Sequence, residues 1–415
     1  MAPSMRFHYI CNDCGRTYAA DDIRYRCPEC AGTEQPGEMQ KGNLRTVIDP
    51  EYLLSLGRKA REGQPLRPAD FMPYPIPHIE TYPVGGTPLI GPGRLRDRTG
   101  CTGLWLKNDG MNPSGSFKDR ASQLVAAQAL HYGISTVTLA STGNAGSAMA
   151  CAGAAYGLEI VLFVPHTAPQ NKLLQSVLYG AKVVPVRDTY DTAFGLSLEY
   201  TSRHGGINRN TGYNPMTIEG KKSISIELFQ DLGGAMPDVI YVPVGDGVIY
   251  SGVYKGFSDL HLAGLIPGIP TIVAVQSTRS NAIASSWEND TYRTISAAST
   301  SADSISVASP ANGRMAIDFI RASGSWATEV TDEAITAAQL ELAVDAGTFV
   351  EPAAAAAYAG FKADLAADRI SNKQKIVILL TGIGFKDMQA VASSVSVPPA
   401  VEPNMEAVEN FLRIS

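Results

Sequence analysis

The sequence has no apolar run of the roughly 20 residues that a membrane-spanning helix requires, and its first residues, MAPSMRFHYIC, include no apolar signal core. It also has no block of acidic or basic residues, and its formal net charge is only −6. These absences argue against a membrane or a nucleic acid as a partner. We therefore expect a cytoplasmic protein whose six cysteines stay reduced.

The chain is long and rich in apolar residues. The chain has 415 residues, of which 45% are hydrophobic, so it can form two lobes and an appendage. From about residue 84, short β-branched runs alternate with helical stretches, which predicts an α/β fold with open, mainly parallel sheets. Residues 276–330 are weakly patterned, and we expect a loop-rich insertion there. Strands are predicted at 137–140, 160–164, 182–186, 239–242, 271–275 and 376–380, and helices at 117–132, 145–156, 171–179, 192–203, 220–232, 248–262 and 333–346.

Four cysteines near the N-terminus follow the spacing C-x2-C-x12-C-x2-C, namely Cys11, Cys14, Cys27 and Cys30. Each C-x2-C pair can turn two thiolates toward one ion, and two pairs make a closed tetrahedral site. The spacing predicts a structural zinc ion that supports folding rather than catalysis. The alternative is a set of redox-active or unliganded cysteines.

A lysine lies in the segment NPSGSFKDR, residues 112–120, directly before a predicted helix. The positive end of a helix dipole disfavours the ammonium form of such a lysine. Lys118 therefore suits Schiff-base chemistry, in which a neutral amine attacks an aldehyde. The alternative is that Lys118, Asp119 and Arg120 form a solvated charged turn.

Three further loops follow predicted strands, where ligands bind in parallel sheets. The loop STGNAG at 141–146 offers hydroxyls and N–H groups to a carboxylate, and Asn144 is suited to a ring hydroxyl. The glycine-rich loop at 244–252 suits a phosphate, provided that the Asp246 carboxylate points away from it. The Thr381 hydroxyl, at a strand end, is suited to a pyridine nitrogen. Each loop alone is also consistent with an ordinary turn.

Taken in this order and spacing, these segments resemble the fold-type II pyridoxal-phosphate enzymes, the group of the tryptophan synthase β-subunit, and specifically the threonine synthase family. The resemblance runs from the GGTPL segment at 85–89 to residue 387, about three quarters of the chain. An N-terminal zinc-ribbon-like segment also occurs in that family. The most specific pieces are residues 112–120, 141–144, 219–222, 349–352 and 380–382.

The resemblance implies a two-lobed fold of open, twisted, mainly parallel sheets, and a homodimer. A large cofactor-binding domain would comprise residues 81–120 and 221–415. A small mobile domain, residues 121–220, would close over a small amino-acid substrate. Residues 1–40 would form the zinc-ribbon-like segment and residues 41–80 a linking arm.

The resemblance also implies roles for individual residues. Lys118 would hold pyridoxal 5'-phosphate and move the α-proton of the substrate, with Phe117 beside the ring. Asn144 would bind the ring hydroxyl, Thr381 would meet the ring nitrogen, and Glu351 would face the site. The substrate carboxylate would be held by Ser141, Thr142, Asn144 and Ala145, and the cofactor phosphate by Gly245, Asp246, Gly247, Val248 and Ile249.

Two segments depart from the family pattern. In NPMTIEGK, residues 214–221, Thr217 stands where the family often has arginine and Lys221 where it has glutamine. An arginine would pair with a substrate phosphate through two hydrogen bonds, so Lys221 or Lys222 is the remaining source of charge. The loop at 245–252 is closer to those of amino-acid dehydratases.

The implied activity is conversion of O-phosphohomoserine and water to threonine and phosphate by β,γ-replacement. One alternative is β-elimination or β-replacement on a serine-, threonine- or phosphoserine-type amino acid, as in an ammonia-lyase, a dehydratase or a cysteate-synthase-like enzyme. A second alternative is a non-catalytic binding protein on the same fold.

Overall fold

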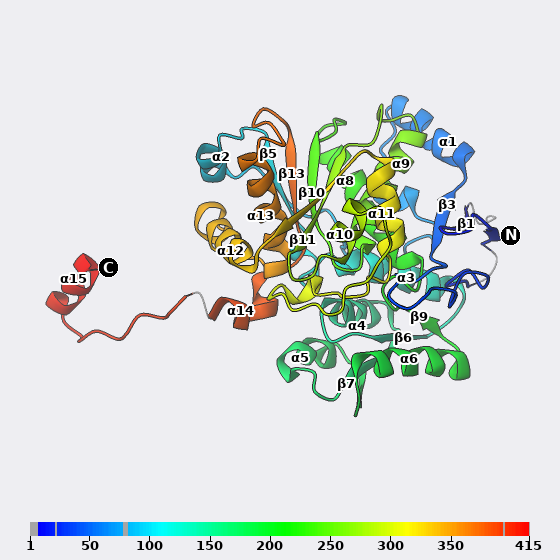
Figure 1. Ribbon diagram of the computed structural model, residues 1–415, viewed down its shortest axis with the longest axis horizontal. Coiled ribbons are helices and arrows are strands. Elements are labelled where there is room, and N and C mark those ends of the chain that lie inside the picture. Colours follow the sequence, from blue (N-terminus) through cyan, green and yellow to red (C-terminus); the bar gives the residue numbers. More distant parts are fainter. Residues whose placement is uncertain (1–6, 21–22, 78–81, 393–394, 415) are drawn as a thin grey trace.

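Three sheets form the framework of the protein in a computed structural model that describes residues 7–20, 23–77, 82–392 and 395–414. Two are mainly parallel sheets covered by helices, and the third is a small antiparallel sheet beside the larger of the two (Figure 1). The predicted α/β architecture with mainly parallel sheets is confirmed.

The larger sheet is parallel except for the short edge strand β4. Alternate residues of its central strand β10 enter different cores. Ile240 and Val242 pack with one helical layer, and Val239 and Tyr241 pack with the other. A strand covered on both faces must be apolar throughout, which explains its unbroken hydrophobic run. The strand order is β12 (Ala327–Val330), β11 (Thr271–Ser277), β10 (Val239–Pro243), β13 (Ile376–Leu380), β5 (Leu104–Asn108) and β4 (Leu89–Ile90).

Helices on the two faces of this sheet come from different parts of the chain. One face carries α12 (Asp332–Ala346) and α13 (Pro352–Ala366), together with α2 (Gly93–Thr99). The other carries α8 (Ser223–Asp231), α9 (Val248–Leu262) and α11 (Gly313–Ala322) (Figure 1).

The smaller sheet has four parallel strands, β8 (Lys182–Val186), β7 (Glu159–Pro165), β6 (Thr136–Ala140) and β9 (Ile207–Asn208) in spatial order. All of them lie within the range predicted for the small domain, whose boundaries and mobility stay predictions. Its covering helices are α3 (Lys118–His131), α4 (Asn144–Tyr156), α5 (Gln170–Leu178) and α6 (Tyr190–His204), with the short α7 (Met216–Glu219) after it.

The N-terminal sheet extends past the predicted end of the ribbon at residue 40. Its order is β2 (Thr17–Ala19), β1 (Phe7–Cys11) and β3 (Leu44–Ile48), and β3 pairs with the whole length of β1. The following helix α1 (Pro50–Arg61) packs so closely on α9 that a Cβ on Gly57 would lie 1.8 Å from the carbonyl oxygen of Ala263. Residues 44–61 of the predicted linking arm are therefore packed on the body, and the boundary between ribbon and arm stays a prediction.

Two segments differ from expectation. Residues 276–330 contain α10 (Ala282–Glu288), α11 and β12, where a loop-rich insertion was expected. The sequence pattern also missed α13, because an alanine-rich helix buried on all sides has no polar stripe. At the C-terminus, α14 (Met388–Ala392) is followed by an extended segment and by α15 (Met405–Ile414), which lies apart from the body (Figure 1). Among the described residues, none of the helices could span a bilayer.

Candidate active site

A narrow cavity lies at the carboxyl ends of β10 and β13, the position expected for a ligand in a parallel sheet. It brings together the predicted lysine, the glycine-rich loop and the predicted ring-nitrogen contact, although they are far apart in the sequence. Its lining residues are Lys118, Thr211, Lys221, Pro243, Val244, Gly245, Asp246, Gly247, Val248, Ile249, Ser304, Ile305, Ala353 and Thr381.

Lys118 is the first residue of α3, and the chain before it is fastened to the end of β13. The Phe117 N–H donates to the Thr381 carbonyl oxygen at 2.8 Å, and Ser116 forms a bridge with Gly382. Burial lowers the pKa of Lys118, while the nearby Glu351 raises it and Arg209 lowers it further. The site thus favours a neutral amine, the form that attacks an aldehyde.

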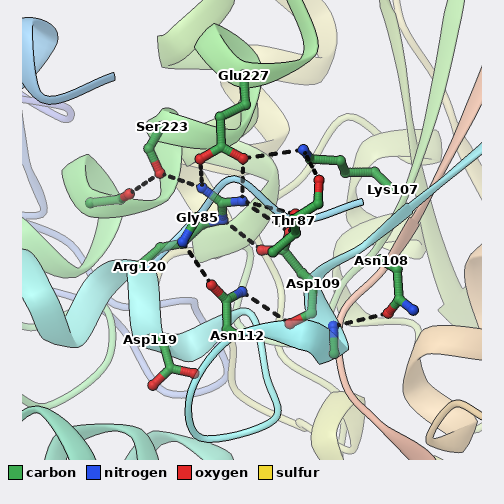
Figure 2. A network of polar contacts seen from close by, with 12 residues as sticks. Gly85, Thr87, Lys107, Asn108, Asp109, Asn112, Asp119, Arg120, Ser223 and Glu227 are labelled. Carbon is green, nitrogen blue, oxygen red and sulfur yellow. Dashed lines mark hydrogen bonds and ion pairs between the residues drawn. The ribbon is translucent and has the colours of Figure 1, made fainter. Parts of the chain in front are cut away.

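Arg120 anchors the beginning of α3 in a buried polar network (Figure 2). Its guanidinium pairs with Asp109, with Nε 2.5 Å from Oδ2, and with both Glu227 oxygens at 2.7 and 2.8 Å. Lys107 adds a contact of 3.2 Å to Glu227. The solvated charged turn considered from the sequence is therefore wrong, because Asp119 and Arg120 are both buried.

The glycine-rich loop leads into α9. Gly247 precedes that helix with φ +83°, and a Cβ there would lie 2.9 Å from the Asn312 carbonyl oxygen. The first N–H groups of a helix lack intrahelical partners, so those of α9 are available to a phosphate. The Asp246 carboxylate accepts a hydrogen bond from the Ala311 N–H at 3.0 Å, and burial raises its pKa. This donor set fits the phosphate of pyridoxal phosphate.

The loop at 141–146 precedes α4 on the small sheet. Its Ser141 Oγ accepts hydrogen bonds from Gly143 N–H at 3.3 Å and Gly146 N–H at 3.0 Å, which shapes the turn. The Asn144 amide donates to Glu351 Oε2 at 2.8 Å, so Asn144 and Glu351 lie together beside the cavity. Thr142 and Ala145, in the same loop, are half-buried.

A wider cleft adjoins the cavity and shares Ser304 with it. Contacts between the two sheets cross this cleft. Lys386 Nζ donates to Ser147 Oγ at 2.9 Å and to Gln175 Oε1 at 2.6 Å. On the rim, Lys172 forms an ion pair of 2.7 Å with Asp303. A motion of the smaller sheet away from the larger one would have to break these contacts.

Lys221 and Lys222 were the two lysines considered as a source of charge for a substrate phosphate. Lys221 lines the cavity and Lys222 does not. The Lys221 Nζ donates to the Thr217 carbonyl oxygen at 2.7 Å, and burial lowers its pKa well below the ordinary value. Lys222 instead pairs with Glu219 at 2.7 Å and Asp259 at 2.6 Å. The Thr217 hydroxyl donates to the Asn214 carbonyl oxygen at 2.7 Å, inside its own turn.

Sequence reasoning missed Arg209, which directly follows β9 and is fully buried. It lies close enough to Lys118 and Lys221 to lower the pKa of both. Its guanidinium Nη1 donates to the Thr211 hydroxyl at 2.8 Å. The sequence offered no local signal for it, because the two-residue strand β9 before it has no periodic pattern.

The four N-terminal cysteines converge, with their sulfur atoms all within 4.8 Å of one another. A tetrahedral zinc site with bonds of about 2.3 Å has sulfur–sulfur edges of about 3.8 Å. The Cys14 and Cys27 sulfurs are 3.8 Å apart. The cluster therefore fits a zinc ion in both donor type and spacing.

Residues 80–382 match the model of the family described as "Pyridoxal-phosphate dependent enzyme". Similar curated proteins include a threonine synthase of Methanosarcina acetivorans, 33% identical over 98% of each chain. A threonine synthase of Methanocaldococcus jannaschii is 32% identical over 97% of this chain and 98% of its own length.

Solved structures share the fold at lower identity. Threonine deaminase isoform 2 of Solanum lycopersicum superposes with a TM-score of 0.64 at 20% identity, covering 95% of this chain and 97% of its own. An L-serine ammonia-lyase of Rhizomucor miehei has a TM-score of 0.65 at 22% identity, covering 74% of this chain and 97% of its own. These likenesses concern the fold.

Proposed function

This chain belongs to the family of pyridoxal-phosphate-dependent enzymes and is a threonine-synthase-like lyase, and we propose that it converts O-phosphohomoserine and water to threonine and phosphate. The observation that carries the proposal is the cavity that joins Lys118 to the loop at 245–249 and to Thr381. Similarity to threonine synthases over almost the whole chain supports the substrate class.

The residues of the cavity divide the work between holding the cofactor and moving protons. Lys118 Nζ attaches the cofactor and later carries a proton to and from the substrate α-carbon. The loop Gly245, Asp246, Gly247, Val248 and Ile249 holds the phosphate, and Phe117, Asn144 and Thr381 orient the ring. When bound, pyridoxal phosphate supplies an electron sink for negative charge at the substrate α-carbon. A carboxylate would bind at the start of α4, through Ser141, Thr142, Asn144 and Ala145.

The proposal is tested by supplying the purified holoenzyme with O-phosphohomoserine, serine and threonine in separate reactions. We expect phosphate and threonine from O-phosphohomoserine. A second candidate, an ammonia-lyase acting on serine or threonine, is favoured by Thr217, whose hydroxyl donates inside its own turn to the Asn214 carbonyl oxygen. Rapid formation of a 2-oxo acid without phosphate release would favour that candidate and contradict the first.

The cysteine cluster extends the proposal to a structural zinc ion bound by Cys11, Cys14, Cys27 and Cys30. The sulfur geometry supports it, and metal analysis of the purified protein tests it. We further infer a homodimer in the cytoplasm. The dimer rests on the resemblance to the threonine synthase family, and sedimentation of the holoenzyme tests it. The cytoplasm rests on the six cysteines, none of which forms a disulfide in the described residues, and fractionation of cells tests it.

A further inference from the structure

Arg209 is fixed to the smaller sheet beside the loop predicted to hold the substrate carboxylate. Its N–H donates to the Thr138 carbonyl oxygen of β6 at 2.8 Å. The next residue, Asn210, accepts a hydrogen bond from the Ala140 N–H at 2.7 Å through its side chain. Ala140 is the last residue of β6, so these hydrogen bonds tie the segment to the strand that leads into the loop at 141–146.

The Arg209 side chain is fully buried yet poorly satisfied. A guanidinium has five N–H donors, and among the described residues its one side-chain hydrogen bond goes to the Thr211 hydroxyl. Nε and Nη2 are buried with no hydrogen-bond partner within the described part of the chain. Burial lowers the Arg209 pKa to about 10, so the group is still charged near neutral pH. A buried, unpaired cation is costly, and an anionic ligand would relieve that cost.

The surroundings of Arg209 are rich in cations. Thr211, its hydrogen-bond partner, lines the cofactor cavity together with Lys118 and Lys221. In the described residues, no hydrogen-bond partner or ion-pair partner reaches Nε or Nη2 of Arg209. The carboxylates whose charges act on this cluster are bound to other groups through one oxygen each: Asp246 accepts from the Ala311 N–H, Glu351 from Asn144 and Asp119 from the Ser114 hydroxyl.

We propose that Arg209 is the specificity-determining residue for a phosphate group on the substrate, and that it replaces the arginine absent at position 217. This inference rests on the proposed function. A planar fork of donors binds a phosphate through two parallel hydrogen bonds. We assign the phosphate to the substrate rather than to the cofactor because the cofactor phosphate already has a binding loop of its own at 245–249, directly before α9.

The test compares the holoenzyme with the variants Arg209→Gln and Arg209→Lys, using inorganic phosphate as the probe in calorimetric titrations. Loss of a charge-assisted pair predicts roughly 10- to 100-fold weaker phosphate binding for Arg209→Gln. Arg209→Lys keeps the charge without the fork and is expected to fall between the two. The matched control is Arg203→Gln, a change at an exposed residue on α6, which should bind phosphate as the unaltered protein does.

Three further readouts separate the possible roles. With O-phosphohomoserine, Arg209→Gln should raise KM by a similar factor. Affinity for pyridoxal phosphate should fall far less than affinity for inorganic phosphate, and an equal or larger loss would assign Arg209 to the cofactor phosphate and overturn the proposal. The thermal midpoint of the ligand-free variant should not fall below that of the control, because a buried unpaired charge is removed. A marked fall would indicate a structural role.

Failure of this inference is distinguishable from failure of the proposed function. If the unaltered enzyme releases phosphate from O-phosphohomoserine and Arg209→Gln does so with the same KM, the inference is wrong and the function stands. If the unaltered enzyme forms only 2-oxo acids from serine or threonine, the function is wrong. Phosphate titrations then decide separately whether Arg209 binds that anion.

Discussion

The side-chain amide of Asn144 donates a hydrogen bond of 2.8 Å to Oε2 of Glu351. Asn144 begins α4 on the smaller sheet, and Glu351 precedes α13 on the larger one, so this bond joins the two lobes across the site. The second oxygen, Oε1, is buried with no hydrogen-bond partner in the part of the chain that the structure describes. The Glu351 charge raises the pKa of Lys118 and partly offsets the effect of burial.

Replacing Glu351 by glutamine should therefore lower the pKa of Lys118. Only the neutral amine attacks the aldehyde of pyridoxal phosphate, so the rate of cofactor uptake rises with pH through that pKa. In Glu351→Gln this rise should move to lower pH. Stopped-flow absorbance of the ligand-free protein mixed with the aldehyde measures it. Glu333→Gln, at an exposed position on α12, is the control, and an unmoved or upward-moved profile would contradict the prediction.

Replacing Lys118 by alanine should abolish covalent attachment of the cofactor and lower turnover by at least about 10³-fold, because the proton carrier is lost as well. The fold should persist, since the change removes a buried amine rather than an apolar contact. Borohydride reduction followed by mass spectrometry of the intact protein checks the attachment. A variant that still retains the cofactor after reduction and denaturation would show that another amine carries it.

Replacing Arg120 by methionine should destabilise the protein by roughly 3–5 kcal/mol, because Asp109 and Glu227 would be left buried without their cation. Urea unfolding followed by circular dichroism gives the change in the free energy of unfolding. Arg203→Met, which removes an exposed ion pair to Glu199, should change it by about 0.5 kcal/mol or less. Equal effects of the two variants would mean that the network in Figure 2 contributes little.

Asp119 should make stability depend on pH. Burial raises its pKa to about 7, whereas an aspartate in an unfolded chain titrates near pH 4. The folded state therefore holds the proton more tightly. The resulting stabilisation is fully present below about pH 4 and is lost as the pH rises to about 7. The difference in unfolding free energy between the unaltered protein and Asp119→Asn should shift by a few kcal/mol over this range. If this difference in unfolding free energy stays constant with pH, the prediction for Asp119 is wrong.

Replacing Cys27 by serine should remove the zinc ion and lower the thermal midpoint by several degrees, because the metal closes the loops around β1 and β2. Metal analysis and calorimetry measure both effects. Cys101→Ser is the matched control, since Cys101 is also buried but lies outside the cluster. That control should retain the metal. Full zinc content in Cys27→Ser would exclude Cys27 as a ligand.

Much of the framework could be predicted from local patterns. Strands β8 and β13 have the predicted bounds, since short β-branched runs between turns indicate strands directly. The short strands β4 and β9 could not be predicted, because two residues carry no periodic signal. The sequence also left open whether Lys118, Asp119 and Arg120 were solvated. The buried position of Arg120 depends on Glu227, more than 100 positions away.

The sequence by itself determined the chemistry that the protein can hold: a lysine before a helix, glycine-rich loops after strands, and four cysteines at metal spacing. These are local features, so neighbouring residues suffice to specify them. Only the tertiary structure decided which charges meet. It placed Arg209 and Lys221 beside Lys118 while pairing Lys222 with Glu219 and Asp259. The reason is physical, since the interaction of charges depends on distance and burial, and both are set by packing between residues far apart in the chain.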